Sequence, residues 1–444
     1  MAAVDPSVYE IFTITSTDGK KSVDLRGGVV NFSYFEDVFS PMITATVLIT
    51  STGNVMQDED GDMVSMYNGL PLRGGERVSI KIPANSASNV DLEFTEKTEN
   101  EFFVASISNV LIDAESEAFT LNLVSREVIT NETSRVGKKF PSSEPISDSV
   151  KEIIEKYLKS KKNINVDETM NPYGFFGHMK KPFTLLTWLA AKSVPGNSSG
   201  QSASAGYFFY ETKGGYNFRS IDTLITEKPF IEKYNYTPGI VDSQDPRRDF
   251  KILQYNVSRN QNLLNNLERG AYCTHRMYFN PVTFEFTTVE QGLYKVADYA
   301  DKMENLGDDF KLDLPPVDES GKTLEDLPSR FVTGVLDFGI TERKDKNSRK
   351  KNADPMEYKS QAMMRYNTIF TNTCTVTIPL NTNLVAGGII DIVFAKITTE
   401  EQKVVDQKQS GLYMIKELVH FYESSGSFTK LKLIKDTFGK RVEW

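Results

Sequence analysis

The C-terminal part of the chain, residues 365–439, alternates apolar and polar positions with a period of two. Successive side chains of a strand point to opposite faces of a sheet, so this period is typical of half-buried antiparallel strands. Glycine and asparagine residues separate the runs and indicate hairpin turns. The strand-like runs are residues 373–379, 389–394, 411–421 and 428–439. A set of about four or five such strands is enough to form a small closed barrel without exposed edges.

The first 135 residues show the same pattern. β-branched and aromatic residues dominate their apolar runs, which fits a pleated sheet better than a helix. We therefore predict an all-β domain of about six to eight short strands over residues 1–135. A Gly-Gly pair introduces a strand in each of the two β regions, at Gly74-Gly75 and at Gly387-Gly388.

Between the β regions, residues 136–248 change to a helical period. The first predicted helix begins at Ser149–Glu152, a capping box whose side chains would satisfy free backbone N–H groups. Apolar residues recur at helical spacing, and lysines stand at the C-terminal end, where cations suit the helix dipole. The apolar positions are Val150, Ile153, Ile154, Tyr157 and Leu158, and the lysines are Lys159, Lys161 and Lys162.

A second helix is predicted to begin at Pro182, because proline is well tolerated in a first helical turn. The Ser- and Gly-rich residues 196–206 predict a flexible loop. The runs 207–210 and 216–221 predict a hairpin around Gly214-Gly215. Helices beside a small sheet make this region an α+β insertion, so the predicted fold class is mainly β with an α+β insertion.

Strand-like runs return over residues 249–290, where a short helix is predicted at 263–267 and a strand at 270–279 pairs with 283–287. Residues 291–360 are polar and poor in strand signals, and we interpret them as an excursion before the C-terminal strands over 361–444.

Composition excludes several classes of protein. The 444 residues carry a net charge of −9, which argues against a protein that grips nucleic acid. No signal-peptide pattern is visible, and no apolar run reaches the roughly 18 residues of a membrane helix. We expect no membrane insertion and a reducing compartment. The two cysteines, Cys273 and Cys374, lie in strand-like runs; a disulfide across a barrel is open, but two buried thiols are favoured.

The sequence predicts no catalytic, cofactor-binding or metal-binding residues. His178, His275 and His420 lack partners at zinc-ligand spacing, and we interpret the latter two as hydrogen-bonded strand residues. The acidic turn Asp58–Asp62 suggests calcium, but its glycine is misplaced for an EF-hand loop and a solvated turn is favoured. The Gly-Gly pairs lack the Lys-Ser/Thr of a phosphate loop. The basic residues 343–351 could contact DNA or an acidic neighbour; a solvated loop is the simpler interpretation.

Four stretches together resemble one family in its order along the chain. They are 39–47 with 69–76, 181–190 with 207–221, 365–367 with 376–384, and 410–413 with 433–439. The chain resembles the central baseplate hub protein of contractile-tailed bacteriophages, and the related hub part of type VI secretion spikes.

The resemblance implies two tail-tube-like β-barrels flanking the α+β module. The second barrel would be discontinuous, built from 249–290 and 361–444, and 291–360 would join the module. A homotrimer would then present six similar barrels, matching a hexameric tail tube protein on one side and a trimeric spike protein on the other, with baseplate wedge proteins around it. DNA would pass through the lumen without specific binding, which requires neutral or acidic walls.

The predicted function is a non-enzymatic hub of a phage baseplate, located in the virion and assembled in the host cytoplasm. Two other classes stay open: a tail-associated cell-wall hydrolase, whose paired carboxylates could lie among the many acids, and a receptor-binding tail protein.

Overall fold

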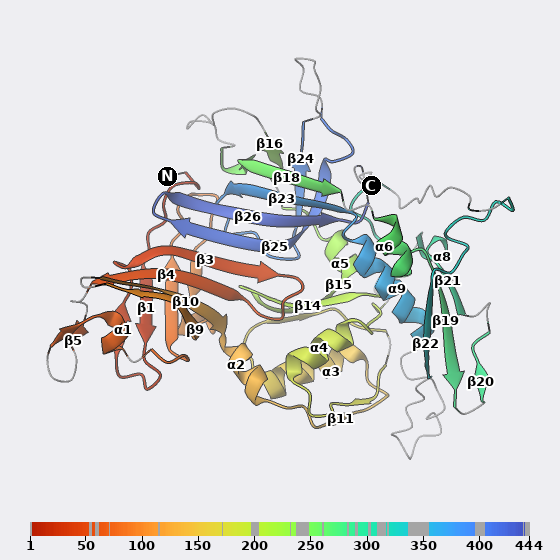
Figure 1. Ribbon diagram of the computed structural model, residues 1–444, viewed down its shortest axis with the longest axis horizontal. Helices are drawn as coiled ribbons and strands as arrows, with labels where there is room; N and C mark the ends of the chain where they lie inside the picture. The colour runs from red at the N-terminus through yellow and green to blue at the C-terminus, as the bar shows by residue number, and fades with distance from the viewer. Residues whose placement is uncertain are drawn as a thin grey trace.

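The computed structural model describes most of the chain and is mainly β with an α+β insertion, which confirms the predicted fold class (Figure 1). The described residues are 2–52, 56, 57, 62–70, 72–113, 116–170, 172–196, 204–230, 232–236, 248–259, 262–281, 284–288, 292–300, 303–308, 317, 319–335, 355–395, 405–437 and 439.

Eight antiparallel strands form the centre of the molecule, and each bonds to the next across the whole series. In spatial order they are β9 (Phe102–Ile112), β10 (Ser116–Ser125), β4 (Thr44–Thr52), β3 (Val29–Asp37), β25 (Gly411–Glu423), β26 (Gly426–Lys435), β23 (Asn372–Pro379) and β18 (Gln254–Arg259). Four of them come from the first β region and four from the later part of the chain, so we call this set the eight-strand sheet.

The pairing of β3 with β25 joins the two halves of this sheet. It runs from Asp37 opposite Glu417 to Asn31 opposite Glu423. The first residues of β25 use the same edge to pair with β24 (Ile389–Val393). Because β3 occupies this edge, the eight strands belong to one open sheet; no two separate closed barrels are found among the described strands, contrary to the sequence-based expectation.

One hydrophobic core serves both halves of the sheet. It combines Phe32 and Tyr34 of β3 with Tyr413 and Tyr422 of β25, and the rings of Phe32 and Tyr422 stack with centroids 5.6 Å apart. The two β regions therefore bury their apolar faces together rather than each on its own.

Short strands extend the sheet, some beside β9 and others beside β24, which pairs with β25. On the N-terminal side they are β1 (Ile11–Thr15), β2 (Ser22–Asp24), β7 (Arg77–Ile82) and β8 (Leu92–Phe94), and on the C-terminal side β16 (Tyr234–Tyr236) and β17 (Lys251–Ile252). The first region also holds β5 (Met56–Gln57), β6 (Met63–Val64), α1 (Met66–Gly69) and the turn η1 (Glu96–Thr98), and η3 (Arg248–Phe250) precedes β17. The described residues of the first β region thus form ten strands, β1 to β10, of which four have only two or three residues.

The α+β insertion packs below the sheet in Figure 1 and has its own core. Its elements are α2 (Arg126–Thr133), β11 (Lys139–Phe140), α3 (Ile146–Glu152), the π-helical turn η2 (Ile153–Leu158), β12 (Ile164–Val166), β13 (Phe175–Phe176), α4 (Pro182–Ala190), β14 (Tyr207–Thr212), β15 (Gly215–Ser220) and α5 (Ile221–Thr226). The helix start at Pro182 and the β14–β15 hairpin confirm the predictions. Gly215 has φ +119°, and an added Cβ would lie 2.2 Å from the Asn163 carbonyl oxygen, so the turn requires glycine.

The predicted capping box is wrong. Helix α3 begins at Ile146, with Pro145 in the extended N-cap position, so Ser149 lies inside the helix and is buried. The helix starts earlier because Ile146 is itself a buried core residue, whereas Ser149 caps nothing. Lys162, which follows the C-terminal end of this helix, is buried, as described below.

The chain returns to the sheet through a small separate sheet and a helix. These elements are α6 (Leu263–Glu268), β19 (Cys273–Asn280), β20 (Glu285–Phe286), β21 (Leu293–Lys295), α8 (Ala297–Ala300), β22 (Arg330–Val335) and α9 (Pro355–Thr368). The short helix and the β19–β20 pair confirm the predictions, and Cys273 and Cys374 are buried free thiols. Tyr358 and Ala362 of α9 pack into the insertion core, so the predicted boundary at 361 falls within this helix. No helix among the described residues is long and apolar enough to cross a membrane.

His420 of β25 lies buried at the β3–β25 junction, opposite Tyr34, and its Nδ1 is 2.9 Å from the Thr429 hydroxyl. Burial, together with nearby Lys213, lowers the pKa of His420 to about 3. The neutral ring therefore stabilises the fold fully above the unfolded-state pKa near ~6.5, and this stability is lost as pH falls toward the folded-state value.

We predict that His420→Gln flattens the pH dependence of the unfolding free energy between about pH 6 and pH 4, by up to ~1.4 kcal/mol per pH unit. Urea unfolding over this range measures it. His178→Gln, at an exposed histidine, should leave the slope unchanged. Equal slopes for His420→Gln and the wild type would contradict the prediction.

Candidate functional site

One face of the eight-strand sheet is polar. Alternate side chains of each strand point away from the core, and the strand register aligns them in rows. Most of these side chains are Ser, Thr, Asn or Gln. The set, which we call the polar face, is Ser106, Ser108, Thr120, Asn122, Thr44, Thr46, Leu48, Asn31, Ser33, Phe35, Asp37, Lys416, Glu417, Val419, Phe421, Glu423, Phe428, Lys430, Lys432, Thr373, Thr375, Thr377, Gln254, Asn256 and Ser258.

The charges on the polar face balance. Three acids, Asp37, Glu417 and Glu423, face three lysines, Lys416, Lys430 and Lys432. Lys416 Nζ lies 2.6 Å from the Asp37 carboxylate, and Lys432 Nζ lies 3.4 Å from that of Glu417. This set of side chains thus has no net formal charge.

Both outer edges of the eight-strand sheet are open among the described residues. Strand β9 pairs with β7 only at Phe102 and Phe103, so its outer edge has no partner strand from Ala105 to Ile112. Within the part of the chain that the structure describes, strand β18 pairs only with β23. Open edges present unpaired N–H and C=O groups to another chain. Seven antiparallel steps separate β9 from β18, so these two edge strands run in opposite directions.

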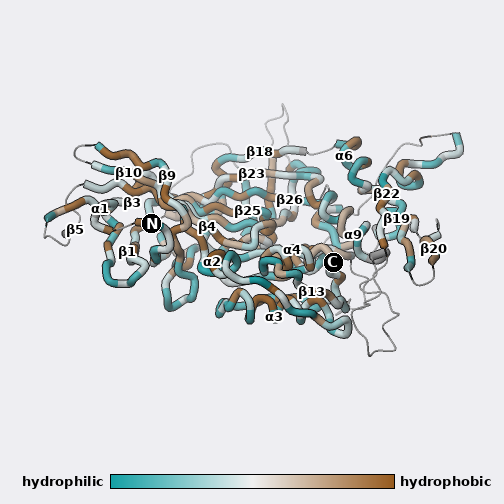
Figure 2. The backbone as a smooth tube through the Cα atoms, turned by 60° about the horizontal axis from the view of Figure 1, so that its bottom comes forward, coloured by the Kyte–Doolittle hydropathy of each residue, from teal (hydrophilic) through white to brown (hydrophobic). Residues whose placement is uncertain are grey.

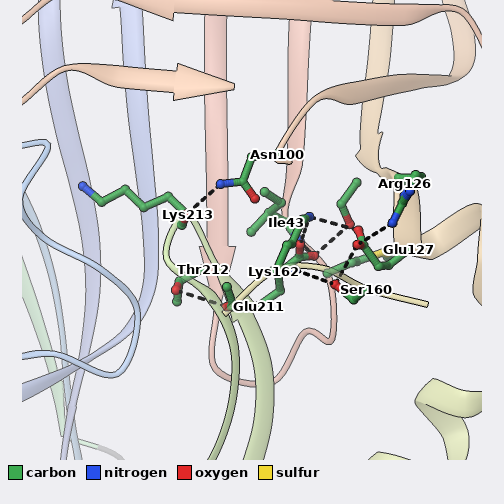
Figure 3. Close-up of polar contacts among 12 residues, drawn as sticks. Ile43, Asn100, Arg126, Glu127, Ser160, Lys162, Glu211, Thr212 and Lys213 are labelled. Carbon is green, nitrogen blue, oxygen red and sulfur yellow. Dashed lines mark hydrogen bonds and ion pairs between the residues drawn. The ribbon is translucent and has the colours of Figure 1, made fainter. Parts of the chain in front are cut away.

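A buried ion triad joins the first β region to the insertion (Figure 3). Lys162 Nζ lies 2.5 Å from a Glu211 oxygen and 3.0 Å from a Glu127 oxygen, and all three side chains are at most 2% exposed. The second Glu211 oxygen accepts from the backbone N–H of Ile43 and from the Ser125 hydroxyl. Every member of the triad therefore has a partner.

Electrostatics keep this triad ionic. Burial alone would lower the pKa of Lys162, but attraction to Glu211 and Glu127 outweighs burial and raises it. Burial raises the pKa of Glu211, and Lys162 opposes that shift. The neutral form of Lys162 is thus disfavoured, and the triad acts as a structural cross-link rather than as an acid or base reached by substrate.

Glu36 connects three segments at the same junction. Its carboxylate accepts from the Tyr34 hydroxyl at 2.6 Å, from the Lys213 N–H of the β14–β15 turn at 2.7 Å, and from the Ala386 N–H before β24 at 2.8 Å. Burial raises the pKa of Glu36, and these donors counter the shift.

On the other side of the insertion, Arg365 likewise connects three segments of the chain. It lies on α9, is 1% exposed, and pairs with Asp222 of α5 at 2.7 Å and with Asp436 after β26 at 3.2 Å. It also donates to the Glu304 carbonyl. Helix α9, the insertion and the end of the last strand are thus held by one guanidinium, whose fork geometry suits two carboxylates.

The three histidines lie on different elements. His178 is exposed before α4, whereas His275 of β19 and His420 are buried in strands. The prediction that both strand histidines are hydrogen-bonded holds for His420, but His275 has no hydrogen-bond partner among the described residues. Within those residues no three His, Cys, Asp or Glu side chains gather as for a metal ion. Residues 58–61 and 343–351 lie outside the described residues.

We predict that Lys162→Met costs about 3–5 kcal/mol of unfolding free energy, because it leaves two buried carboxylates without a cation. The matched control is the neighbouring Lys161, whose side chain is 69% exposed and pairs with Glu99 at 3.2 Å. Lys161→Met should cost about 0–1 kcal/mol. Chemical unfolding of both variants measures the difference, and equal small losses would show that the triad does not stabilise the junction.

No protein-family model and no curated protein matches this sequence. Solved structures match its fold. The tail protein from Neisseria meningitidis MC58 aligns with 96% of this chain and 96% of its own, at 10% identity and a TM-score of 0.52. The 43 kDa tail protein of prophage MuSo2 from Shewanella oneidensis covers 96% of this chain and 100% of its own, at 9% identity and a TM-score of 0.53. The chain has the fold of these tail proteins, and at the level of the fold this agrees with the family resemblance seen in the sequence.

Proposed function

We propose that this chain is a structural, non-enzymatic hub that assembles as a homotrimeric ring in a contractile phage tail. The observation that carries the proposal is the eight-strand sheet, which joins two β regions and ends in two open edges. The fold shared with tail proteins supports a role in a tail.

The open edges offer a way to close the ring. Because β9 and β18 run in opposite directions, a rotated second copy would place its β9 antiparallel to β18 of the first, continuing the pattern of the sheet. Such head-to-tail contacts close under a cyclic rotation. Three copies of eight strands would form a wall of 24 strands, and barrels of about 16–18 strands already enclose an aqueous channel.

The polar face is suited to line that channel. Its three lysines are balanced by three acids, so the face has no net positive charge to hold DNA, whose non-specific affinity comes mostly from phosphate contacts with cations. DNA would then pass without specific binding. The opposite, apolar face is filled by the shared core and is not free for this role.

The two ends of the ring would bind different partners. The β9–β10 hairpin and the small sheet of β19, β20 and β22 lie at opposite ends of the molecule in both views (Figures 1 and 2). Two β regions per chain give six in a trimer, matching a hexameric tail tube protein, while the threefold end would receive a trimeric spike protein. Baseplate wedge proteins would surround the ring, in a virion assembled in the host cytoplasm.

The first test is mass in solution. The purified 50.0 kDa chain should elute with a light-scattering mass near ~150 kDa, three times its own. A single species of one chain's mass at all concentrations would contradict the ring.

The second test locates the contact. A Ser108→Cys, Asn256→Cys double variant places thiols on β9 and β18, while both native cysteines are buried. We expect a short bis-maleimide to give covalent dimers and trimers. The control pairs Ser108→Cys with Lys20→Cys, at an exposed turn residue, and should stay uncross-linked. Equal cross-linking of both variants would show that the edges are not the interface.

A further inference from the structure

An aromatic pocket opens on the insertion, between β13 and α4, with a volume of about 280 Å³. Tyr173, Phe175 and Trp188 form its wall, with ring centroids 5.5–5.7 Å apart. Phe140 of β11 supports the wall from behind, stacked on Phe175 at 4.5 Å. This interlocked set of rings fixes the shape of the pocket before any ligand arrives.

Two lysines lie beside the aromatic rings of the pocket. Lys180 Nζ lies 5.7 Å from the Trp188 ring centroid and has no ion-pair partner among the described residues. Lys192 Nζ lies 4.8 Å from the same ring, and His178 stands at the rim. No Asp, Glu, Asn or Gln of the described segments lines the cavity. Lysine ammonium groups beside an aromatic wall favour an anionic ligand with an apolar part.

The rim carries exposed apolar side chains on a strained turn. Phe176 is 43% exposed and Met179 is 61% exposed. His178 and Met179 both have positive φ, 49° and 55°, which costs a non-glycine residue about 1–3 kcal/mol. An added Cβ at Gly177 would lie 2.2 Å from the Val136 carbonyl oxygen, so this turn is pressed against the neighbouring segment. Strain of this kind clusters at ligand sites.

We propose that this pocket binds an acidic peptide segment of a partner protein, one that carries an apolar or aromatic side chain next to a carboxylate. The apolar side chain would fill the space between Phe176, Leu185 and Trp188, and the carboxylate would lie beside the Lys180 ammonium. The helix α4 lies on the side of the molecule opposite β18 and β23 in both views (Figures 1 and 2).

The chain supplies its own reporter for the test. It has two tryptophans, and Trp444→Phe leaves Trp188 of the pocket as the only one. Fluorescence of this variant is titrated with acetyl-Glu-Phe-Glu-amide and with neutral acetyl-Gln-Phe-Gln-amide. We expect saturable binding of the acidic peptide with a Kd on the order of 1 mM, and at least about tenfold weaker binding of the neutral one.

Substitutions then separate the two parts of the site. Lys180→Gln and Phe176→Ser, both at exposed positions, should each weaken binding of the acidic peptide by about tenfold. Lys20→Gln, at a distant exposed lysine, is the matched control and should bind like the parent. The proposal is overturned if both peptides bind alike, or if the Lys180 or Phe176 variant binds like the parent. It is also overturned if a dT oligonucleotide displaces the peptide, because the site would then recognise negative charge alone.

Discussion

The pairing of β3 with β25 is the contact on which the rest of the structure depends. It converts two β regions, separated by most of the chain, into one eight-strand sheet with one core. Because β3 occupies the edge of β25, neither half of the sheet closes into a barrel. The strand edges without a partner are then those of the outer strands β9 and β18. Those open edges, and the polar face between them, are what make an assembly of several copies physically reasonable.

Buried charges hold the insertion against this sheet. A buried ion pair gains little over a hydrophobic contact, but breaking one is costly, so such contacts specify geometry more than they add stability. Glu36, Glu211 and Arg365 each join segments far apart in the sequence. Their satisfied partners define how the modules meet. The aromatic pocket lies away from these junctions. The turn at its rim is held by backbone hydrogen bonds of its own.

Local structure was predictable from the sequence where periodicity is strong. The period-two runs of β23 and β26, the β14–β15 hairpin and the helix start at Pro182 follow from single-segment chemistry. The β3–β25 pairing could not be predicted from the sequence, because any strand edge offers the same N–H and C=O groups. The burial of Lys162 could not be predicted either, since its two carboxylate partners come from α2 and β14. Glu36 did leave a signal: it continues the inward alternation of Phe32 and Tyr34.

The most direct measurement is a cryo-electron microscopy reconstruction of the purified chain. The account predicts a threefold ring in which β9 of one copy pairs with β18 of the next and the polar face lines a continuous channel. A ring whose lumen is lined by the insertion, or a particle in which the β9 and β18 edges both face solvent, would contradict it.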